Sequence, residues 1–288
     1  MIGYGRGGPS NHVQEAEAGR AKLIGAVQEC LVQACHQAHL DYETVRFQAA
    51  CLGFSGGPLD KEPILREVLR CDRMTVTHDA LIALSGATNG EPGVVVIAGT
   101  GSIAFGRNAA GKTARAGGWG YIFGDEGSGF DITRQALRAA LRFEEGWGAS
   151  TVLHEALLYD SNARDANEAL HNYYMIDFPR DRIAAMSKLV DKAAIAGDPV
   201  AAQILDAAAQ QLAALVWAVR DQLFSPGESP RISYVGGVFQ SARVLDRFRF
   251  IIDAHPPVYG PAAGALLEAY RMAQIHVSLA GVPEVEKQ

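Results

Sequence analysis

Apolar and polar residues alternate in blocks along the first third of the chain. Short apolar runs bounded by glycine or polar residues are typical of buried strands, and apolar residues spaced three and four apart are typical of helices. We therefore predict strands over about residues 47–54, 74–77 and 94–98, and helices over about 15–39, 64–69 and 80–87. Strands that alternate with helices predict an α/β fold in which crossovers join parallel strands.

The rest of the chain is mostly helical in pattern. Helical spacing of apolar residues dominates from about 128 to 223. We further predict a β-hairpin that turns at 108–111, a long Ala-rich core helix over about 200–224, a last buried strand at 232–235, and helices over about 241–254 and 261–278.

A glycine-rich stretch from 93 to 131 carries the most distinctive chemistry. Its apolar run at 94–98 is followed directly by Gly99, Thr100, Gly101 and Ser102. Glycine lets the backbone turn sharply and approach a ligand closely. Successive backbone N–H groups in such a turn form an anion site, and the two hydroxyls add donors. This turn is therefore a candidate phosphate loop.

The second half of this stretch combines Trp119 with two adjacent carboxylates, Asp125 and Glu126, ahead of a predicted helix. A helix N-terminus beside a carboxylate pair and an indole suits a polyhydroxy ligand. The alternative is a pair of structural turns with a solvated acidic pair.

Polar residues also follow the ends of the predicted strands. Ser55, Asp79 and Thr100 each come directly after a strand. Ligands of open α/β sheets bind outside the carboxyl ends of the strands, so these positions predict one shared site. Asp79 fits two roles, the cap of the next helix or a general base.

Composition narrows the class of partner and the compartment. The chain has 288 residues, a net charge of −6 and no basic stripe, so we expect no nucleic-acid partner. No apolar run reaches the roughly 20 residues of a membrane span, and no signal peptide precedes Ser10, so we expect a cytoplasmic protein without a membrane segment. The cysteines lack metal-binding spacing and are expected to be free thiols: Cys30, Cys35, Cys51 and Cys71.

Two short segments match the residue patterns of known catalytic or nucleotide-binding motifs. Residues 106–113 fit the P-loop pattern, but the segment after Lys112 is too short and glycine-rich for the helix that a P-loop requires, which favours a hairpin tip. Residues 53–57 fit the G-x-S-x-G pattern of serine hydrolases, but Pro58 follows where an elbow turns at once into a helix. A serine hydrolase is the less favoured alternative.

A longer match is more specific. It consists of six segments that follow one another along the chain, at residues 10–12, 52–57, 77–80, 97–102, 117–129 and 235–238. Together they resemble the N-acetylglucosamine kinase family, grouped with BadF/BadG-type ATPases in the actin-like ATPase and sugar kinase superfamily. The resemblance implies a two-lobed α/β fold of ribonuclease H-like type. An N-terminal lobe would span 1–91, with a C-terminal helix at about 264–280 packed back onto it, and a C-terminal lobe would span 92–263.

The resemblance also implies residue roles in an ATP-dependent kinase that phosphorylates the 6-hydroxyl of N-acetylglucosamine or a related hexosamine. Asp79 would accept the proton of that hydroxyl. The implied sugar contacts are Asn11, His12, Gly118, Trp119 and Asp125. The implied ATP contacts are Gly99, Thr100, Gly101 and Ser102 on the phosphate side and Gly236, Gly237 and Ser241 on the adenosine side. Mg²⁺ would accompany ATP, its protein ligands being unassigned, and a homodimer is the expected assembly.

The sequence departs from the family in one respect. Members begin with a strand and an Asp-Gly-Gly-Gly-Thr-Lys-type loop that grips the phosphates and Mg²⁺, and no such loop precedes Asn11 here. The N-terminal lobe would then lack its first two strands, and we expect weak or no kinase activity. A non-catalytic amino-sugar-binding regulator and a BadF/BadG-type ATPase are the alternatives. The four cysteines do not form the iron–sulfur set of the related dehydratase-activating ATPases.

Overall fold

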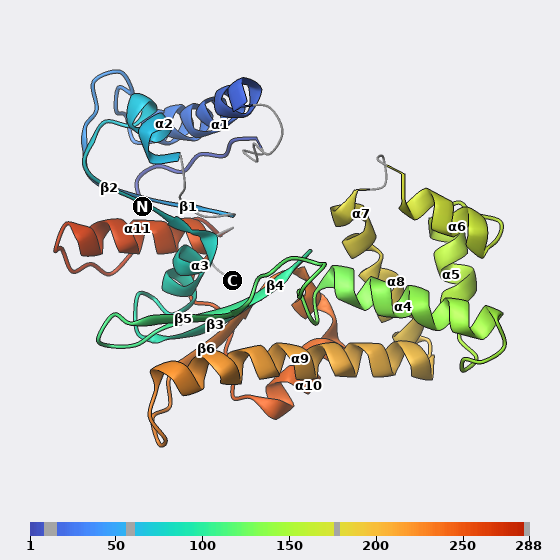
Figure 1. Ribbon diagram of the computed structural model, residues 1–288. Helices are drawn as coiled ribbons and strands as arrows, with labels where there is room; N and C mark the ends of the chain where they lie inside the picture. Colours follow the sequence, from blue (N-terminus) through green and yellow to red (C-terminus); the bar gives the residue numbers. More distant parts are fainter. Residues whose placement is uncertain (9–15, 56–60, 176–178, 285–288) are drawn as a thin grey trace. The chain divides into compact units, whose positions relative to one another are not determined.

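The computed structural model describes residues 1–8, 16–55, 61–175 and 179–284, and the chain divides into two compact units (Figure 1). The first unit is discontinuous and comprises Met1–Glu91 together with Pro257–Gln288. The second comprises Pro92–Pro256. The candidate site residues are divided between these two units.

The first unit has a parallel strand pair, β1 (Phe47–Phe54) and β2 (Cys71–His78). Helix α2 (Lys61–Val68) lies between the two strands in the chain and packs on β2. The register places Phe54 opposite His78, so the chain leaves both strands at the same edge of the sheet. This is the crossover that the alternating pattern predicts.

The first residues of the chain lie along helix α1 (Ala16–Gln37), which also packs against α2. The backbone N–H of Tyr4 donates to Oε1 of Gln37 at 2.9 Å, and that of Arg6 donates to Oε1 of Gln33 at 2.9 Å. Glutamines one helical turn apart thus fix the opening segment in an extended course along the helix.

Helix α11 (Pro261–Met272) packs closely on α3 (Asp79–Ala87), the helix that carries the candidate base. A Cβ atom on Gly264 would overlap the carbonyl oxygen of Ile82 and lie 2.5 Å from the amide nitrogen of Gly86. The two backbones are therefore in contact where the helices cross, and only glycine fits at 264. This crossing joins the C-terminal segment to the first unit.

The second unit has a mixed sheet in the order β5-β4-β3-β6 among the described residues. Its strands are β3 (Gly93–Ala98), β4 (Ser102–Arg107), β5 (Thr113–Gly117) and β6 (Arg231–Val235). β3 is antiparallel to β4 and parallel to β6, although β6 lies far along the chain. The carboxyl ends of β3 and β6 consequently meet at one edge.

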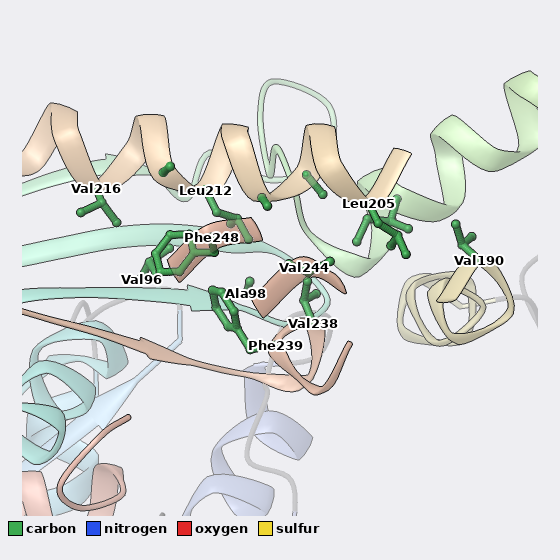
Figure 2. Close-up of a cluster of buried hydrophobic side chains, with 14 of the residues drawn as sticks. Val96, Ala98, Val190, Leu205, Leu212, Val216, Val238, Phe239, Val244 and Phe248 are labelled. Atoms are coloured by element: carbon green, nitrogen blue, oxygen red, sulfur yellow. The ribbon is translucent and has the colours of Figure 1, made fainter. Parts of the chain in front are cut away.

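Helix α9 (Pro199–Leu223) is the central helix of this unit. It packs against β3, β4 and β5 and also contacts helices on both sides (Figure 1). The other helices are α4 (Gly129–Glu144), α5 (Leu153–Asp160), α6 (Ala166–Tyr173), α7 (Arg180–Ala185), α8 (Ser187–Ile195), α10 (Ala242–Ile251) and the 3₁₀ turn η1 (Gly237–Gln240). Figure 2 shows Leu212 and Val216 of α9 facing Val96 of the sheet and Phe248 of α10.

The same helix is long and apolar enough to cross a membrane by length and composition alone. Its apolar face, however, is buried against the sheet, with Leu205, Leu212 and Val216 at 1% exposure or less. A core helix of this length passes the same test of apolarity, so the packing of α9 identifies it as a core helix.

The predicted elements are present, with shifted ends. The strand predicted at 74–77 begins earlier, at Cys71, because its pairing with β1 extends through polar residues. The helix predicted over 261–278 ends at Met272, and Gln274 just beyond it has a left-handed φ of 61°, which terminates helices.

The strand predicted at 94–98 belongs to the second unit, where its partners are β4 and β6. The hairpin tip favoured over a P-loop at 106–113 is confirmed: Lys112 ends the turn between β4 and β5, where the Asn108 N–H donates to its carbonyl oxygen at 3.0 Å, and no helix starts there.

Asp198 caps α9 and ties it to the start of α5. Its Oδ1 accepts from the N–H groups of Val200 and Ala201, both at 2.9 Å. Its Oδ2 accepts from the hydroxyl of Thr151 at 2.8 Å and from the N–H of Val152 at 2.7 Å. Burial raises the pKa of this carboxyl, but these hydrogen bonds outweigh burial and lower its pKa below the usual value.

We expect Asp198→Ala to destabilise the second unit by about 1–3 kcal/mol at pH 7, because a cap and two links to α5 are lost. A carboxyl whose folded pKa is lowered stabilises above its unfolded pKa of about 3.9 and loses that contribution as pH falls through the folded pKa. Urea denaturation at pH 7 and at acid pH should therefore show a smaller difference between the two proteins at acid pH. A difference that does not change with pH would contradict this account.

We expect Gly264→Ala to destabilise the first unit by about 1–3 kcal/mol or more, because the added methyl group meets backbone of α3 and not a movable side chain. Gly25→Ala in α1 is the matched control, since nothing lies within 4 Å of its Cβ position and alanine favours helix. Equal urea midpoints for Gly264→Ala and the unmodified protein would disprove the backbone contact.

Candidate functional site

The candidate phosphate loop of the second unit connects β3 to β4. The Gly99 N–H donates to the Gly101 carbonyl oxygen at 2.9 Å, which closes a tight turn. Ser102 is buried, and its hydroxyl donates to the Glu126 carbonyl oxygen at 2.7 Å. Thr100 is half-buried, and its hydroxyl has no hydrogen-bond partner among the residues that the structure describes. The loop is thus anchored at Ser102 and leaves the Thr100 hydroxyl open to a ligand.

A second glycine turn lies next to this loop. Gly236 follows β6, has a φ of 113° that disfavours other residues, and packs so tightly on Ala98 that a Cβ would overlap its carbonyl oxygen. Gly237 is exposed, with nothing within 4 Å of its Cβ position. Because β3 and β6 are parallel neighbours, the structure brings both predicted nucleotide turns together at one edge of the sheet.

Ser241, also predicted on the adenosine side, is the N-cap of α10. Its hydroxyl oxygen accepts from the Val244 N–H at 3.4 Å, and the hydroxyl donates to Oδ1 of Asp191. Its hydrogen-bonding groups are therefore engaged within the protein. A contact between Ser241 and adenosine stays a prediction.

The acidic loop lies directly on the phosphate loop. Asp125 is 3% exposed and has a left-handed φ of 63°. Its Oδ1 accepts from the Ser102 N–H at 3.3 Å, and its Oδ2 accepts from Nη2 of Arg180 at 2.5 Å. Both carboxylate oxygens lie 2.9 Å from the Cβ position of Gly101, so the carboxylate covers this glycine. Asp125 is a buried, paired carboxylate and not a solvated one.

The other predicted sugar contacts of this unit lie close by. The Gly118 N–H donates to the Ser102 carbonyl oxygen at 2.9 Å. Trp119 is 64% exposed, and the Arg115 guanidinium lies 4.4 Å from its ring centroid. Gly118 and Asp125 thus meet at Ser102, and the adjacent Trp119 presents an indole face beside them.

The N-terminus of α4 is tied to the same loop, as the predicted helix start requires. Gly129 N–H donates to the Gly99 carbonyl oxygen at 2.8 Å. The Ser128 hydroxyl caps the helix by accepting from Asp131 N–H at 3.1 Å, and Asp131 pairs with Arg134 at 2.6 Å. These hydrogen bonds tie the buried start of α4 to the phosphate loop and fix the spacing between the two loops.

Arg180 has no sequence signal and emerges only from the structure. It is the first residue of α7, and its guanidinium lies 5.1 Å from the ring centroid of Tyr121 and 6.0 Å from that of Phe130. It also lines an apolar cavity of about 470 Å³ between α4, α5, α6 and α7. Asp125 and Arg180 are 55 positions apart in the sequence, which explains why spacing could not pair them.

The first unit holds the predicted base. Asp79 is exposed at the first position of α3, and its Oδ1 accepts from the Ala80 N–H at 2.9 Å. The positive end of the helix dipole stabilises its charge. Ser55 follows β1 at the same sheet edge, because Phe54 pairs with His78. Asn11 and His12 lie outside the described residues, and the shared site that would join Asp79 to Thr100 stays a prediction.

Metal-binding chemistry is sparse in the described part of the chain, where no three histidine, cysteine or acidic side chains converge on a metal site. The four cysteines are free thiols. Burial and, secondarily, Glu268 raise the pKa of the Cys51 thiol to about 12, so it is a poor thiolate ligand at neutral pH.

Comparison with known proteins identifies a family and relatives that are similar to this chain. The model of the BadF/BadG/BcrA/BcrD ATPase family matches residues 3–269. An N-acetylmuramic acid/N-acetylglucosamine kinase from Clostridium acetobutylicum is 34% identical over 257 residues, which cover 87% of this chain and 82% of that protein. An N-acetyl-D-glucosamine kinase from Dictyostelium discoideum is 32% identical and covers 71% of this chain and 67% of its own length.

A solved structure agrees with the sequence match. A candidate N-acetylglucosamine kinase from Chromobacterium violaceum is similar with a TM-score of 0.72 at 27% identity, covering 92% of this chain and 90% of that one. The chain belongs to the BadF/BadG/BcrA/BcrD ATPase family and has the α/β fold of the actin-like ATPases and sugar kinases.

Proposed function

We propose that this protein is an ATP-dependent kinase that phosphorylates the 6-hydroxyl of N-acetylglucosamine or a related hexosamine. The observation that carries the proposal is the pair of glycine turns at the carboxyl ends of β3 and β6, with the Trp119 and Asp125 loop bonded to the first of them. Relatives that are 34% and 32% identical are named as kinases of these amino sugars, which supports the same substrate class here.

The nucleotide would occupy the edge formed by these two turns. The backbone N–H groups of Thr100 and Gly101 and the open Thr100 hydroxyl are donors for phosphate oxygens, whereas the N–H groups of Gly99 and Ser102 are bonded within the protein. The bare backbone at Gly237 leaves room for the adenosine side. ATP supplies the transferred phosphoryl group, and Mg²⁺ would enter with its phosphates, since Mg²⁺ commonly binds through one or two carboxylates plus substrate oxygens.

The sugar side needs a base and an orienting surface. The Asp79 carboxylate is exposed and makes no salt bridge in the described part of the chain, so it is available to orient a hydroxyl and take its proton. The exposed Trp119 indole suits the apolar face of a pyranose ring, and the unused lone pairs of Asp125 suit its hydroxyls. Asn11 and His12 complete the proposed sugar contacts.

A cytoplasmic location and a homodimer are further parts of the proposal. Free thiols and the use of ATP both suit a reducing cytoplasm. Light scattering of the purified protein measures the assembly directly.

We expect ADP release from ATP and Mg²⁺ to require N-acetylglucosamine, and Asp79→Asn to lower kcat by at least about 100-fold, because the amide cannot accept the proton. ADP affinity should stay unchanged, since this side chain acts on the sugar. Glu91→Gln, an exposed carboxylate just after α3, is the matched control. ADP release without sugar would support the ATPase alternative, and sugar binding without turnover would support the regulator.

We expect Thr100→Val to raise the Kd for ATP about 10- to 100-fold while leaving the urea midpoint unchanged, because the hydroxyl bonds only to ligand. Ser102→Ala should instead lower the urea midpoint, since its hydroxyl holds the Glu126 carbonyl oxygen. Isothermal titration and denaturation of both variants separate the two roles. Unchanged ATP affinity in Thr100→Val would remove Thr100 from the phosphate site.

A further inference from the structure

The guanidinium of Arg180 lies against the candidate phosphate loop, and the proposed function gives this residue no role. Nη2 of Arg180 is 3.0 Å from the Cβ position of Gly101 and 2.5 Å from Oδ2 of Asp125. The Arg180 side chain is 39% exposed, and that of Asp125 is 4% exposed. The pair therefore has one buried member and one that reaches the surface from α7.

The buried member needs this partner. A carboxylate removed from water is costly unless its charge is paired and its lone pairs are hydrogen-bonded. Without Arg180, Asp125 would place an uncompensated negative charge against Gly101, where phosphates are expected to bind, and the repulsion would be strong at low dielectric. Its hold on the Ser102 N–H would also lose its fixed direction, because Arg180 sets the position of the other oxygen.

The guanidinium is itself held by aromatic contacts. Tyr121 and Phe130 lie 5.0 Å apart by ring centroids, and Arg180 lies over both. A planar guanidinium combines stacking with a directed bond to a carboxylate, whereas an ammonium supplies only a point charge. The site is therefore built for arginine.

We propose that Arg180 is a positioning residue for the nucleotide loop: through Asp125 it fixes Gly101 and Ser102 and neutralises the carboxylate that lies against them. This rests on the proposed function in assigning the loop to ATP, but the ordering of the loop stands on the contacts alone. Arg180 thereby connects α7 and the walls of the neighbouring cavity to the loop.

The test compares Arg180→Gln, Arg180→Lys and the matched control Arg138→Gln, which removes one exposed charge from α4. Hydrogen–deuterium exchange of peptides covering 99–105 reports loop order, and titration with Mg·ADP reports affinity. We expect Arg180→Gln to exchange faster and to bind ADP about tenfold more weakly, a loss typical of one charged hydrogen bond. Arg180→Lys should fall between this variant and the unmodified protein, and Arg138→Gln should match the latter.

Turnover supplies a readout that a merely structural role would not move. Arg180→Gln should raise the KM for ATP by about the same tenfold factor while kcat falls less. Unchanged exchange at 99–105 together with unchanged ADP affinity in a folded Arg180→Gln would overturn the proposal. So would a fall in kcat alone that matches the fraction of folded protein.

Two further results remain interpretable. If Arg180→Gln does not fold, Asp125→Asn/Arg180→Gln removes both charges and takes its place; faster exchange at 99–105 and weaker ADP binding are again expected, and values equal to the unmodified protein would overturn the proposal. If the unmodified protein binds no nucleotide, the proposed function fails, and the exchange measurement alone decides whether Arg180 orders the loop.

Discussion

The second unit depends on the hydrogen bonds of Ser102. Its N–H, hydroxyl and carbonyl oxygen bond respectively to Asp125, to Glu126 and to Gly118. One buried residue at the start of a strand thus attaches the whole glycine-rich stretch that follows to the edge of the sheet. No described residue accepts from the N–H groups of Thr100 and Gly101, which are expected to meet a ligand, so Gly99 and Ser102 on either side of them support the loop.

The sheet edge itself is held by apolar packing. Val96 and Ala98 of β3 are fully buried under the face of α9 that carries Leu212, and Phe248 of α10 closes the same core (Figure 2). Densely packed interiors resist displacement, so the two glycine turns inherit the positions of β3 and β6. Rigid strands beneath irregular loops are the usual way in which folds present ligand sites.

Local patterns in the sequence predict the individual elements, whereas the two-lobed fold is predicted from the resemblance to a family and not from those patterns. The continuous apolar run before Gly99 and the Ala-rich pattern of α9 are local signals, and both elements occur close to the predicted residues. The pairing of β3 with β6 joins segments that lie more than 130 residues apart in the sequence, which is about the length of a typical domain. No local sequence pattern encodes a contact at that distance. Likewise, nothing near Asp125 in the sequence indicates Arg180 as its partner, so the sequence alone leaves open both a ligand contact and a solvated acidic pair for this residue.

The described buried carboxylates of the second unit all act at the start of a helix. This shared role explains why buried polar interactions occur in a core that apolar packing already stabilises. Asp198 caps α9, Asp131 lies in the first turn of α4, and Asp125 binds the first residue of α7. Each carboxylate therefore acts at the beginning of a helix, where it accepts hydrogen bonds from backbone N–H groups or pairs with a basic side chain. Apolar contacts would hold these helices with comparable energy but without direction, whereas hydrogen bonds fix an angle as well as a distance. Two of these three helix starts lie against the glycine turn of β3, so the orientation that the carboxylates impose there is passed to the loop that is expected to grip phosphate.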